Sequence, residues 1–322
     1  MLTQDHEVME AAFDRGINYV DTARRYMNGR NEEIVGRALK GRRDKVFLAT
    51  KAAWISPEHI TADVETSLKK LRTDYIDVIQ LHNVDSNSKA RALARETREV
   101  LKGLRAQGKV RYVGLTTHTN QADVLNAMAA DPEKFYDTVA VGYNFKSPPG
   151  IKEAIARAAL TGVGVIAMKT QAGGYKTEAL GPLSPHQAAL KWALLDQNVT
   201  AAIPGMKDMA MVEEDTAVMG MKFTASDARI LTRYSHAVEG IYCRLCADCE
   251  ATCPGHVAIS TVNRSLMYLE GYGSAELARS TYKEIGKEAS PSVCIGCAVC
   301  KARCVHGLNI RAKMEKAATC FA

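Results

Sequence analysis

Residues 46–82 read VFLATKAAWISPEHITADVETSLKKLRTDYIDVIQLH and contain the pattern that decides the fold. Two short apolar runs, Val46–Lys51 and Tyr75–His82, flank an amphipathic stretch at Pro57–Leu71. Ser56 before Pro57 is a typical helix start, with Ser as the cap and Pro at the first helical position. The runs are continuous rather than alternating, which favours parallel strands buried on both faces. We therefore predict a strand–helix–strand unit.

The same unit repeats along the first two thirds of the chain. Further strands are expected at Ile17–Asp21, Arg111–Thr117, Thr138–Asn144, Gly164–Lys169 and Thr200–Met206, and further helices at Lys89–Gln107, Ile151–Leu160 and Pro185–Leu195. Alternating strands and helices predict a parallel α/β sheet with right-handed crossovers. Because so many units follow one another and no GxGxxG motif follows the first strand, a TIM (β/α)8-type barrel is favoured over an open dinucleotide-binding sheet.

Polar side chains stand at the ends of three consecutive predicted strands. The first strand ends at Asp21 and is followed by Tyr26, the second ends at Lys51 and the third at His82. In a parallel barrel, the carboxyl ends of the strands meet at one mouth, where the chemistry takes place. Taken singly, an Asp after a strand is more often a helix cap and a Lys is more often solvated. A His or Tyr is more often a half-buried side chain whose hydrogen bonds are satisfied. Together they predict an active site.

The chemistry of this set is coherent. A phenol is a weak acid at neutral pH, and a nearby lysine ammonium is expected to lower the pKa of Tyr26. Asp21 would hold Lys51, and His82 would orient a carbonyl group or relay a proton. This combination suits protonation of a carbonyl oxygen as hydride reaches the carbonyl carbon.

The cysteines mark a second region. All nine lie between Cys243 and Cys320. Eight of them form two runs of CxxCxxCxxxC spacing, Cys243–Cys253 and Cys294–Cys304, which is the bacterial ferredoxin pattern, and Pro254 follows the first run. In two-cluster domains the fourth cysteine of each run binds the other cluster. We therefore predict two [4Fe–4S] clusters, one ligated by Cys243, Cys246, Cys249 and Cys304 and the other by Cys294, Cys297, Cys300 and Cys253.

Zinc is the alternative for these thiols, but zinc sites usually pair two separated CxxC units around one ion. Cys320 is left over and is expected to be a free thiol on a mobile tail. His256 and His306 lie near the runs, and we assign neither as a ligand. The longer, helical spacer Ile259–Lys287 indicates an α-helical ferredoxin-like domain.

Composition excludes several other classes. The chain has 322 residues, 24% of them charged and 47% hydrophobic, and a formal net charge of +6, which is ordinary for a soluble globular protein. No apolar stretch reaches the length of a membrane helix, and no basic block indicates nucleic acid as a partner. No signal peptide is visible in MLTQDHEVME, so a cytoplasmic location is expected, where disulfides are disfavoured.

The barrel region resembles the aldo-keto reductases over roughly residues 1–225. The matching motifs are GINYVDTA at 16–23 with Tyr26, EE at 32–33, GRAL at 36–39, ATK at 49–51, DYID at 74–77, LH at 81–82, GKVRYVG at 108–114 and IPG at 203–205. The resemblance implies a TIM barrel, NADPH as hydride donor, and a catalytic tetrad of Asp21, Tyr26, Lys51 and His82 with Tyr26 as the acid and base. The cysteine runs make the chain similar to an iron–sulfur variant of this family.

The resemblance also implies cofactor-binding positions, some of them altered. Thr116-Thr117 replaces a usual Ser-Asn pair at the nicotinamide, the usual Gln near Asn144 is missing, and Met168 stands where an aromatic ring often stacks. Lys207 takes the place that grips the 2′-phosphate, and Trp54 is expected to shape the substrate pocket. The complete set of candidate cofactor contacts is Thr116, Thr117, Asn144, Met168, Lys169, Pro204, Gly205 and Lys207.

The family's first barrel strand has no counterpart, so the barrel would have seven strands of eight. Seven strands leave two unpaired edges. Either the chain lacks its true N-terminus, or, if the start is genuine, we expect the C-terminal domain or a homo-oligomer contact to cover the gap. The expected organisation is a barrel at 1–225, a helical linker at 226–240, a two-cluster domain at 241–310 and a tail at 311–322.

These features predict an oxidoreductase that transfers hydride between NADPH and a small carbonyl or alcohol substrate. In the alternative, the clusters relay single electrons to or from an external ferredoxin-like partner and NADPH is not the donor. A non-enzymatic electron-transfer subunit is disfavoured because the tetrad is intact.

Overall fold

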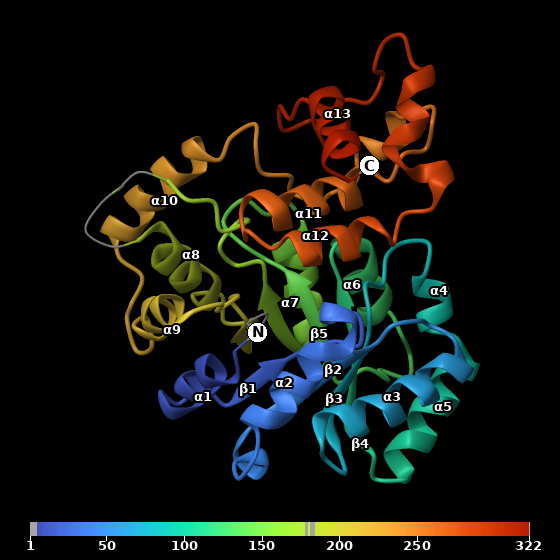
Figure 1. Cartoon of the computed structure of the whole chain (residues 1–322), viewed down its shortest axis with the longest axis vertical. Coiled ribbons are helices and arrows are strands. Elements are labelled where there is room, and N and C mark those ends of the chain that lie inside the picture. The colour runs from blue at the N-terminus through green and yellow to red at the C-terminus, as the bar shows by residue number, and fades with distance from the viewer. Residues whose placement is uncertain (1–4, 178–179, 181–183, 322) are drawn as a thin grey trace.

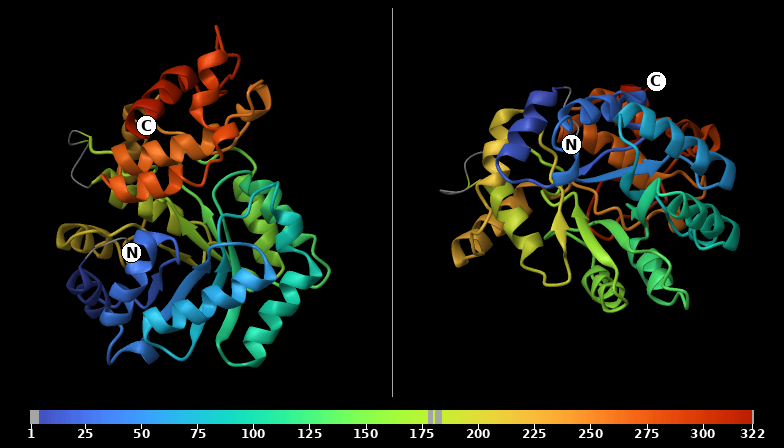
Figure 2. Two further views of the ribbon diagram at one scale, coloured as in Figure 1. Left: turned by 45° about the vertical axis from the view of Figure 1, so that its right-hand side comes forward. Right: turned by 90° about the horizontal axis from the view of Figure 1, so that it is seen from below.

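The sheet has seven parallel strands that pair strictly in sequence order. The computed structural model describes residues 5–177, 180 and 184–321, and its strands are β1 Tyr19–Asp21, β2 Phe47–Ala52, β3 Ile76–Leu81, β4 Val110–Thr117, β5 Thr138–Gly142, β6 Gly164–Met168 and β7 Ala201–Ala202. Each strand pairs with the next, but β1 and β7 do not pair with each other within the described residues. The sheet therefore curls as an open barrel with one gap (Figures 1 and 2). This confirms the predicted α/β barrel type with seven strands.

Helices precede the first strand, separate the successive strands and follow the last strand. They are α1 His6–Asp14, α2 Arg30–Ala38, α3 Pro57–Leu71, α4 Lys89–Ala92, α5 Arg95–Ala106, α6 Gln121–Ala129, α7 Ile151–Leu160, α8 Pro185–Leu194, α9 Met209–Thr216 and α10 Ala225–Ala237. The predicted bounds of α3 and α7 are confirmed. The single helix expected at Lys89–Gln107 is wrong, because the chain is extended at Ala94 and two helices form.

The two predicted helix starts have different chemistry. Ser184 caps α8 in a full capping box with Gln187. Ser56 precedes α3 as expected, but its hydroxyl lies 2.6 Å from Nδ1 of His59 and makes no cap bond to the backbone. Pro57 at the first turn is therefore the main local start signal of α3.

The barrel core consists of strand residues packed against helices. All six residues of β3 are buried, as are the last five of β2. Continuous burial on both faces is what the apolar runs predicted. By contrast β7 has only two residues rather than the seven expected, because Pro204 lacks a backbone donor and cannot continue the ladder.

The C-terminal region packs onto the mouth of the barrel. Its helices are α11 Ile259–Glu270, α12 Ala275–Tyr282 and α13 Ile310–Phe321, and Figure 1 shows α11 and α12 beside the carboxyl ends of the strands. Gly271 ends α11 against Gly173 of the barrel, where a β-carbon would overlap the Gly173 carbonyl group. This close approach fixes how the region sits on the barrel.

The last segment is not the mobile tail that we predicted. Helix α13 buries Ile310, Met314 and Ala317 in a small apolar core with residues of α11. Cys320 lies on this helix and is exposed. In the part of the chain that the structure describes, no helix is long and apolar enough to cross a membrane.

Candidate active site

Asp21 and Lys51 form a buried ion pair at the barrel mouth. Asp21 ends β1 and Lys51 lies near the end of β2, so the parallel pairing of the two strands brings them together. The Lys51 ammonium contacts Asp21 and also donates to the Thr22 carbonyl oxygen at 2.7 Å. Gln80 of β3 donates to the other Asp21 oxygen at 2.8 Å. Three strands thus hold one carboxylate.

Tyr26 and His82 lie beside this pair. The rings of Tyr26 and His82 meet edge to face with centroids 5.9 Å apart, and Nζ of Lys51 lies 4.9 Å from the Tyr26 ring centroid. Nδ1 of His82 is buried without a hydrogen-bond partner among the described residues. The structure therefore brings all four predicted residues into one cluster.

The expected acidification of Tyr26 is wrong. Burial and the negative charge of Asp21 raise the pKa of Tyr26 well above its ordinary value. Lys51 lies near the Tyr26 ring and is paired with Asp21, and its charge does not outweigh these effects. Burial, with Lys51 and Arg25 nearby, lowers the pKa of His82 well below its ordinary value. At neutral pH the phenol is protonated and the imidazole is neutral.

Two supporting residues were not among the predicted site residues. Gln80 is buried within an apolar strand, and a polar residue in such a place needs a partner, which here is Asp21. Glu32 is buried and accepts hydrogen bonds from Thr50 and Ser67, both at 2.7 Å. The sequence signal for Gln80 was a polar residue within an apolar run, and Glu32 belongs to the EE motif at 32–33 that matches the family.

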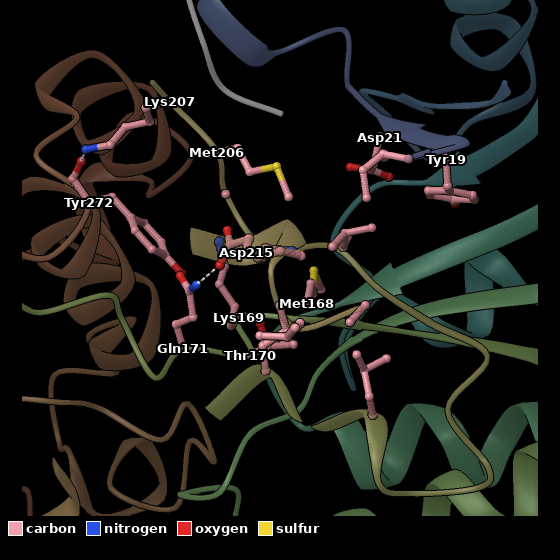
Figure 3. Close-up of a pocket in the computed structure, with 18 of the residues that line it drawn as sticks. Tyr19, Asp21, Met168, Lys169, Thr170, Gln171, Met206, Lys207, Asp215 and Tyr272 are labelled. Atoms are coloured by element: carbon pink, nitrogen blue, oxygen red, sulfur yellow. Dashed lines mark hydrogen bonds between the residues drawn. The ribbon is translucent and has the colours of Figure 1, made fainter. Parts of the chain in front are cut away.

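A cavity of about 190 Å³ occupies the gap between β1 and β7. Tyr19 and Asp21 line it on one side (Figure 3), and Tyr26 is also among its lining residues. Five of the predicted cofactor contacts line it on the other side: Met168, Lys169, Pro204, Gly205 and Lys207. Tyr272 and Ser274 of the C-terminal region complete the wall. The region that we expected to cover the gap thus does line it.

Other predicted contacts lie outside this cavity. The Thr116 hydroxyl accepts from the Asn83 amide at 2.8 Å, and the Thr117 hydroxyl donates to the Thr119 carbonyl oxygen at 3.2 Å. Asn144 donates to the Lys169 carbonyl oxygen and to the Tyr242 hydroxyl, both at 2.9 Å. In this structure these three side chains support the mouth rather than line the cavity.

Trp54 is also placed apart from the cavity. It is 59% exposed, and the Arg25 guanidinium lies 4.4 Å from its ring centroid. It lines a separate surface hollow with Arg25 and Glu276. The expected pocket position of Trp54 is therefore not seen.

The C-terminal region reaches into the mouth through α11. Arg264 is buried, donates to Asn83 at 2.9 Å and forms an ion pair with Glu284 at 2.9 Å. The hydroxyl of Tyr268 accepts from Nζ of Lys169 at 2.7 Å, and Lys207 donates to the Tyr272 carbonyl oxygen. Lys169 and Lys207 of the barrel thus each donate a hydrogen bond to this region.

Three buried polar atoms of cavity-lining residues have no hydrogen-bond partner within the described residues. They are the Tyr19 hydroxyl, the Thr170 hydroxyl and Oδ2 of Asp215. Oδ1 of Asp215 accepts from Gln171 at 2.7 Å (Figure 3). Burial, with Glu214 nearby, raises the pKa of Asp215 to about 7. These atoms are available to a polar ligand.

Eight cysteines fall into two sets. The pKa of the Cys243 thiol is raised by burial and then by Cys249, Cys246 and Cys304. The pKa of the Cys294 thiol is raised by burial and then by Cys253, Cys297 and Cys300. A cavity of about 260 Å³ is lined by the second set: Cys253, Cys294, Cys297 and Cys300. These neighbours of Cys243 and Cys294 belong to the same crossed sets as the predicted ligands, and the ligation of clusters by these sets stays a prediction.

The thiols do not converge on one point. In residues 5–177, 180 and 184–321, no three His, Cys, Asp or Glu side chains gather closely enough to hold a single metal ion. Around the second set the sulfur atoms instead border an open space.

Comparison with known proteins gives consistent matches. The profile of the "Aldo/keto reductase family" matches residues 3–180. Aldo-keto reductase YhdN of Bacillus subtilis is 42% identical over 136 residues, which are 38% of this chain and 40% of YhdN. Methylglyoxal reductase YeaE of Escherichia coli is 27% identical over 251 residues, which cover 72% of this chain and 84% of YeaE.

Solved structures share the fold. An aldo-keto reductase of Klebsiella pneumoniae in complex with NADPH is 25% identical and superposes with a TM-score of 0.60 over 72% of this chain and 84% of that one. The chain spans only about two fifths of the length of YhdN and of the B. subtilis oxidoreductase YqkF.

Proposed function

Because this chain belongs to the aldo/keto reductase family, we propose that its barrel mouth reduces a small carbonyl compound with a nicotinamide cofactor. The observation that carries the proposal is the buried Asp21–Lys51 pair beside Tyr26 and His82 at the carboxyl ends of the strands. The bound cofactor would supply hydride to the carbonyl carbon. Known relatives of this chain include a methylglyoxal reductase, which supports a small carbonyl substrate.

Tyr26 would donate the proton that the carbonyl oxygen takes up. Its raised pKa keeps the phenol protonated until the oxygen becomes basic. Neutral His82 would hydrogen-bond the same oxygen and orient it. Lys51, fixed by Asp21 and the Thr22 carbonyl group, would place positive charge next to the phenolate that proton donation leaves.

The nicotinamide end of the cofactor fits the cavity by its chemistry. The unpartnered Tyr19, Thr170 and Asp215 atoms offer donors and an acceptor to a carboxamide group. Met168 and Ile203 provide apolar surface, and Gly205 leaves open space beside the backbone. The cavity is smaller than the ~300–1,000 Å³ of typical ligand sites, so it would hold the nicotinamide end and the rest of a dinucleotide would extend beyond it.

The cysteine sets would hold two [4Fe–4S] clusters. Each cubane binds four thiolates at separate corners, and the cavity bordered by Cys253, Cys294, Cys297 and Cys300 has room between the sulfur atoms. Cys243, Cys246, Cys249 and Cys304 would hold the other cluster. Such clusters supply one-electron transfer or cross-link the fold.

The test is a fluorescence titration of the anaerobically isolated protein with NADPH, together with an assay of NADPH oxidation by methylglyoxal. Binding and turnover are expected. If NADPH does not bind at millimolar concentration and the iron is present, electron relay to an external partner replaces hydride transfer as the function.

A further inference from the structure

Lys169 is held in a strained position at the barrel mouth. It follows β6 directly and has a positive φ of 58°, a left-handed backbone conformation that is strained for a non-glycine residue and that clusters at functional sites. Asn144 donates to its carbonyl oxygen at 2.9 Å and so fixes this conformation. The Lys169 side chain lines the cavity in the gap of the barrel (Figure 3).

The amine of Lys169 has no carboxylate partner within ion-pair distance among the described residues. Lys51, by comparison, is paired with Asp21. Nζ of Lys169 instead donates to the Tyr268 hydroxyl at 2.7 Å, and it lies 4.2 Å and 5.2 Å from the ring centroids of Tyr268 and Tyr272. The Lys169 amine therefore lies beside two tyrosine side chains, Tyr268 and Tyr272, from a distant part of the chain.

The surroundings favour the uncharged amine. Burial and the nearby Arg264 guanidinium lower the pKa of Lys169 to about 7, although Asp21 acts in the opposite direction. The faces of the two tyrosine rings also attract the charged form. A substantial fraction of Lys169 is therefore a free amine near neutral pH, as lysine nucleophiles require.

We propose that Lys169 is a nucleophilic amine that forms an imine with a small aldehyde or ketone bound in this cavity, with Tyr268 as its proton donor. The proposal rests on the proposed function only in that both need a carbonyl compound in the same cavity. It does not depend on the nicotinamide cofactor or on the clusters.

The step is balanced without an oxidant or reductant. The nitrogen lone pair attacks the carbonyl carbon, a C–N bond forms, and the oxygen becomes the hydroxyl group of a carbinolamine as a proton moves from nitrogen to oxygen. Tyr268 then protonates this hydroxyl, which leaves as water while the C=N bond forms. The remaining nitrogen proton returns to the Tyr268 phenolate. Burial raises the pKa of Tyr268 to about 12, so the phenol carries the needed proton at neutral pH.

The cavity limits the carbonyl compound to a small one. Its volume is about 190 Å³ and its wall is mostly apolar, with Met168, Ile203 and Met206 among the lining residues. A short-chain aldehyde such as propanal matches these limits and is a suitable probe.

The test uses the full chain as isolated, propanal and sodium cyanoborohydride, with no nicotinamide cofactor present. Cyanoborohydride reduces an imine to a stable propyl amine, and peptide mass mapping then locates the propyl groups over time. Lys207 lines the same cavity and serves as the internal comparison. Lys169 is expected to be labelled at least about tenfold faster than Lys207, and Tyr268→Phe is expected to slow labelling of Lys169 about tenfold or more.

Labelling of Lys169 at the rate of Lys207 or of surface lysines would overturn the proposal. Unchanged labelling in Tyr268→Phe would remove Tyr268 as the proton donor. Because the main comparison is made within the unmodified protein, it does not depend on whether a variant folds. A protein that labels at Lys169 but does not oxidise NADPH would retain this inference and lose the proposed reductase activity.

Discussion

The barrel and the cysteine-rich region are held together by different means. The barrel has a large continuous core of strand and helix residues, many of them fully buried. The core of the cysteine-rich region is small. Seven of the nine partly buried residues that pack against it are cysteines or aromatic residues. A small region with little apolar area usually needs metal or disulfides for stability. We therefore expect the barrel to depend on packing and the C-terminal region on its thiols.

The largest expected effect is the loss of iron and of proteolytic resistance on removing one cysteine of a set. Cys297→Ser takes one ligand from the cavity-lining set, and the iron content is expected to fall from about eight to about four atoms per chain. The C-terminal region should become sensitive to proteolysis while the barrel remains folded. Cys320→Ser, at an exposed position, is the matched control and should keep all its iron. Equal iron content in both variants would reject the cluster assignment.

The next effect is on catalysis in the barrel. Tyr26→Phe removes the proposed proton donor and should reduce the turnover of NADPH-dependent carbonyl reduction by about 10²- to 10⁴-fold. Tyr112→Phe changes an exposed tyrosine of β4 and should keep full activity. Normal turnover of Tyr26→Phe, measured by NADPH oxidation, would assign the proton donor to another residue.

A smaller effect is expected where the two regions meet. Arg264→Met leaves Asn83 and Glu284 without their buried cation, although Arg25 still lies 3.3 Å from Glu284. We expect a loss of about 2–3 kcal/mol in the free energy of unfolding. The measurement is urea unfolding of the anaerobic protein, with the exposed Arg279→Met on α12 as the control. Equal stability of the two variants would show that the regions are not coupled through Arg264.

The smallest expected effect is on the pH dependence of stability, through the carboxyl group of Asp215 in the barrel cavity. Burial raises the pKa of Asp215 from 3.8 to about 7, so the neutral acid is favoured in the folded state. The contribution of the protonated Asp215 carboxyl to the free energy of unfolding is complete below pH ~4. It is lost as pH rises through ~7. Asp215→Asn should therefore be more stable than the unmodified protein by about 1–2 kcal/mol at pH 8.5, with the difference shrinking towards pH 5.5.

The check for Asp215 is the urea midpoint at several pH values. Asp44→Asn, at an exposed position, should show no such pH-dependent difference. A pH-independent effect of Asp215→Asn would contradict the raised pKa, because it would mean that folding does not change the protonation of Asp215 between pH 5.5 and 8.5.

Local patterns in the sequence determined most of the barrel. Apolar runs and Pro57 predicted the strands and helix α3, because parallel strands are buried on both faces and proline favours the first turn of a helix. Strand ends predicted that Asp21 and Lys51 would meet, because parallel pairing fixes which residues share an edge. The crossed ligand sets came from the ferredoxin spacing, in which the fourth cysteine of each run binds the other cluster, and they stay a prediction.

Only the tertiary structure decided how the two regions act on each other. Tyr268 lies 99 residues from Lys169 along the chain, and Arg264 lies 181 residues from Asn83, so no local pattern could predict these contacts. The pKa of Tyr26 also depended on tertiary burial, which outweighed the lysine charge expected from the sequence. Burial and long-range contacts are properties of the packed chain, whereas periodicity and spacing are properties of short segments, and the proposed role of Lys169 could come only from the former.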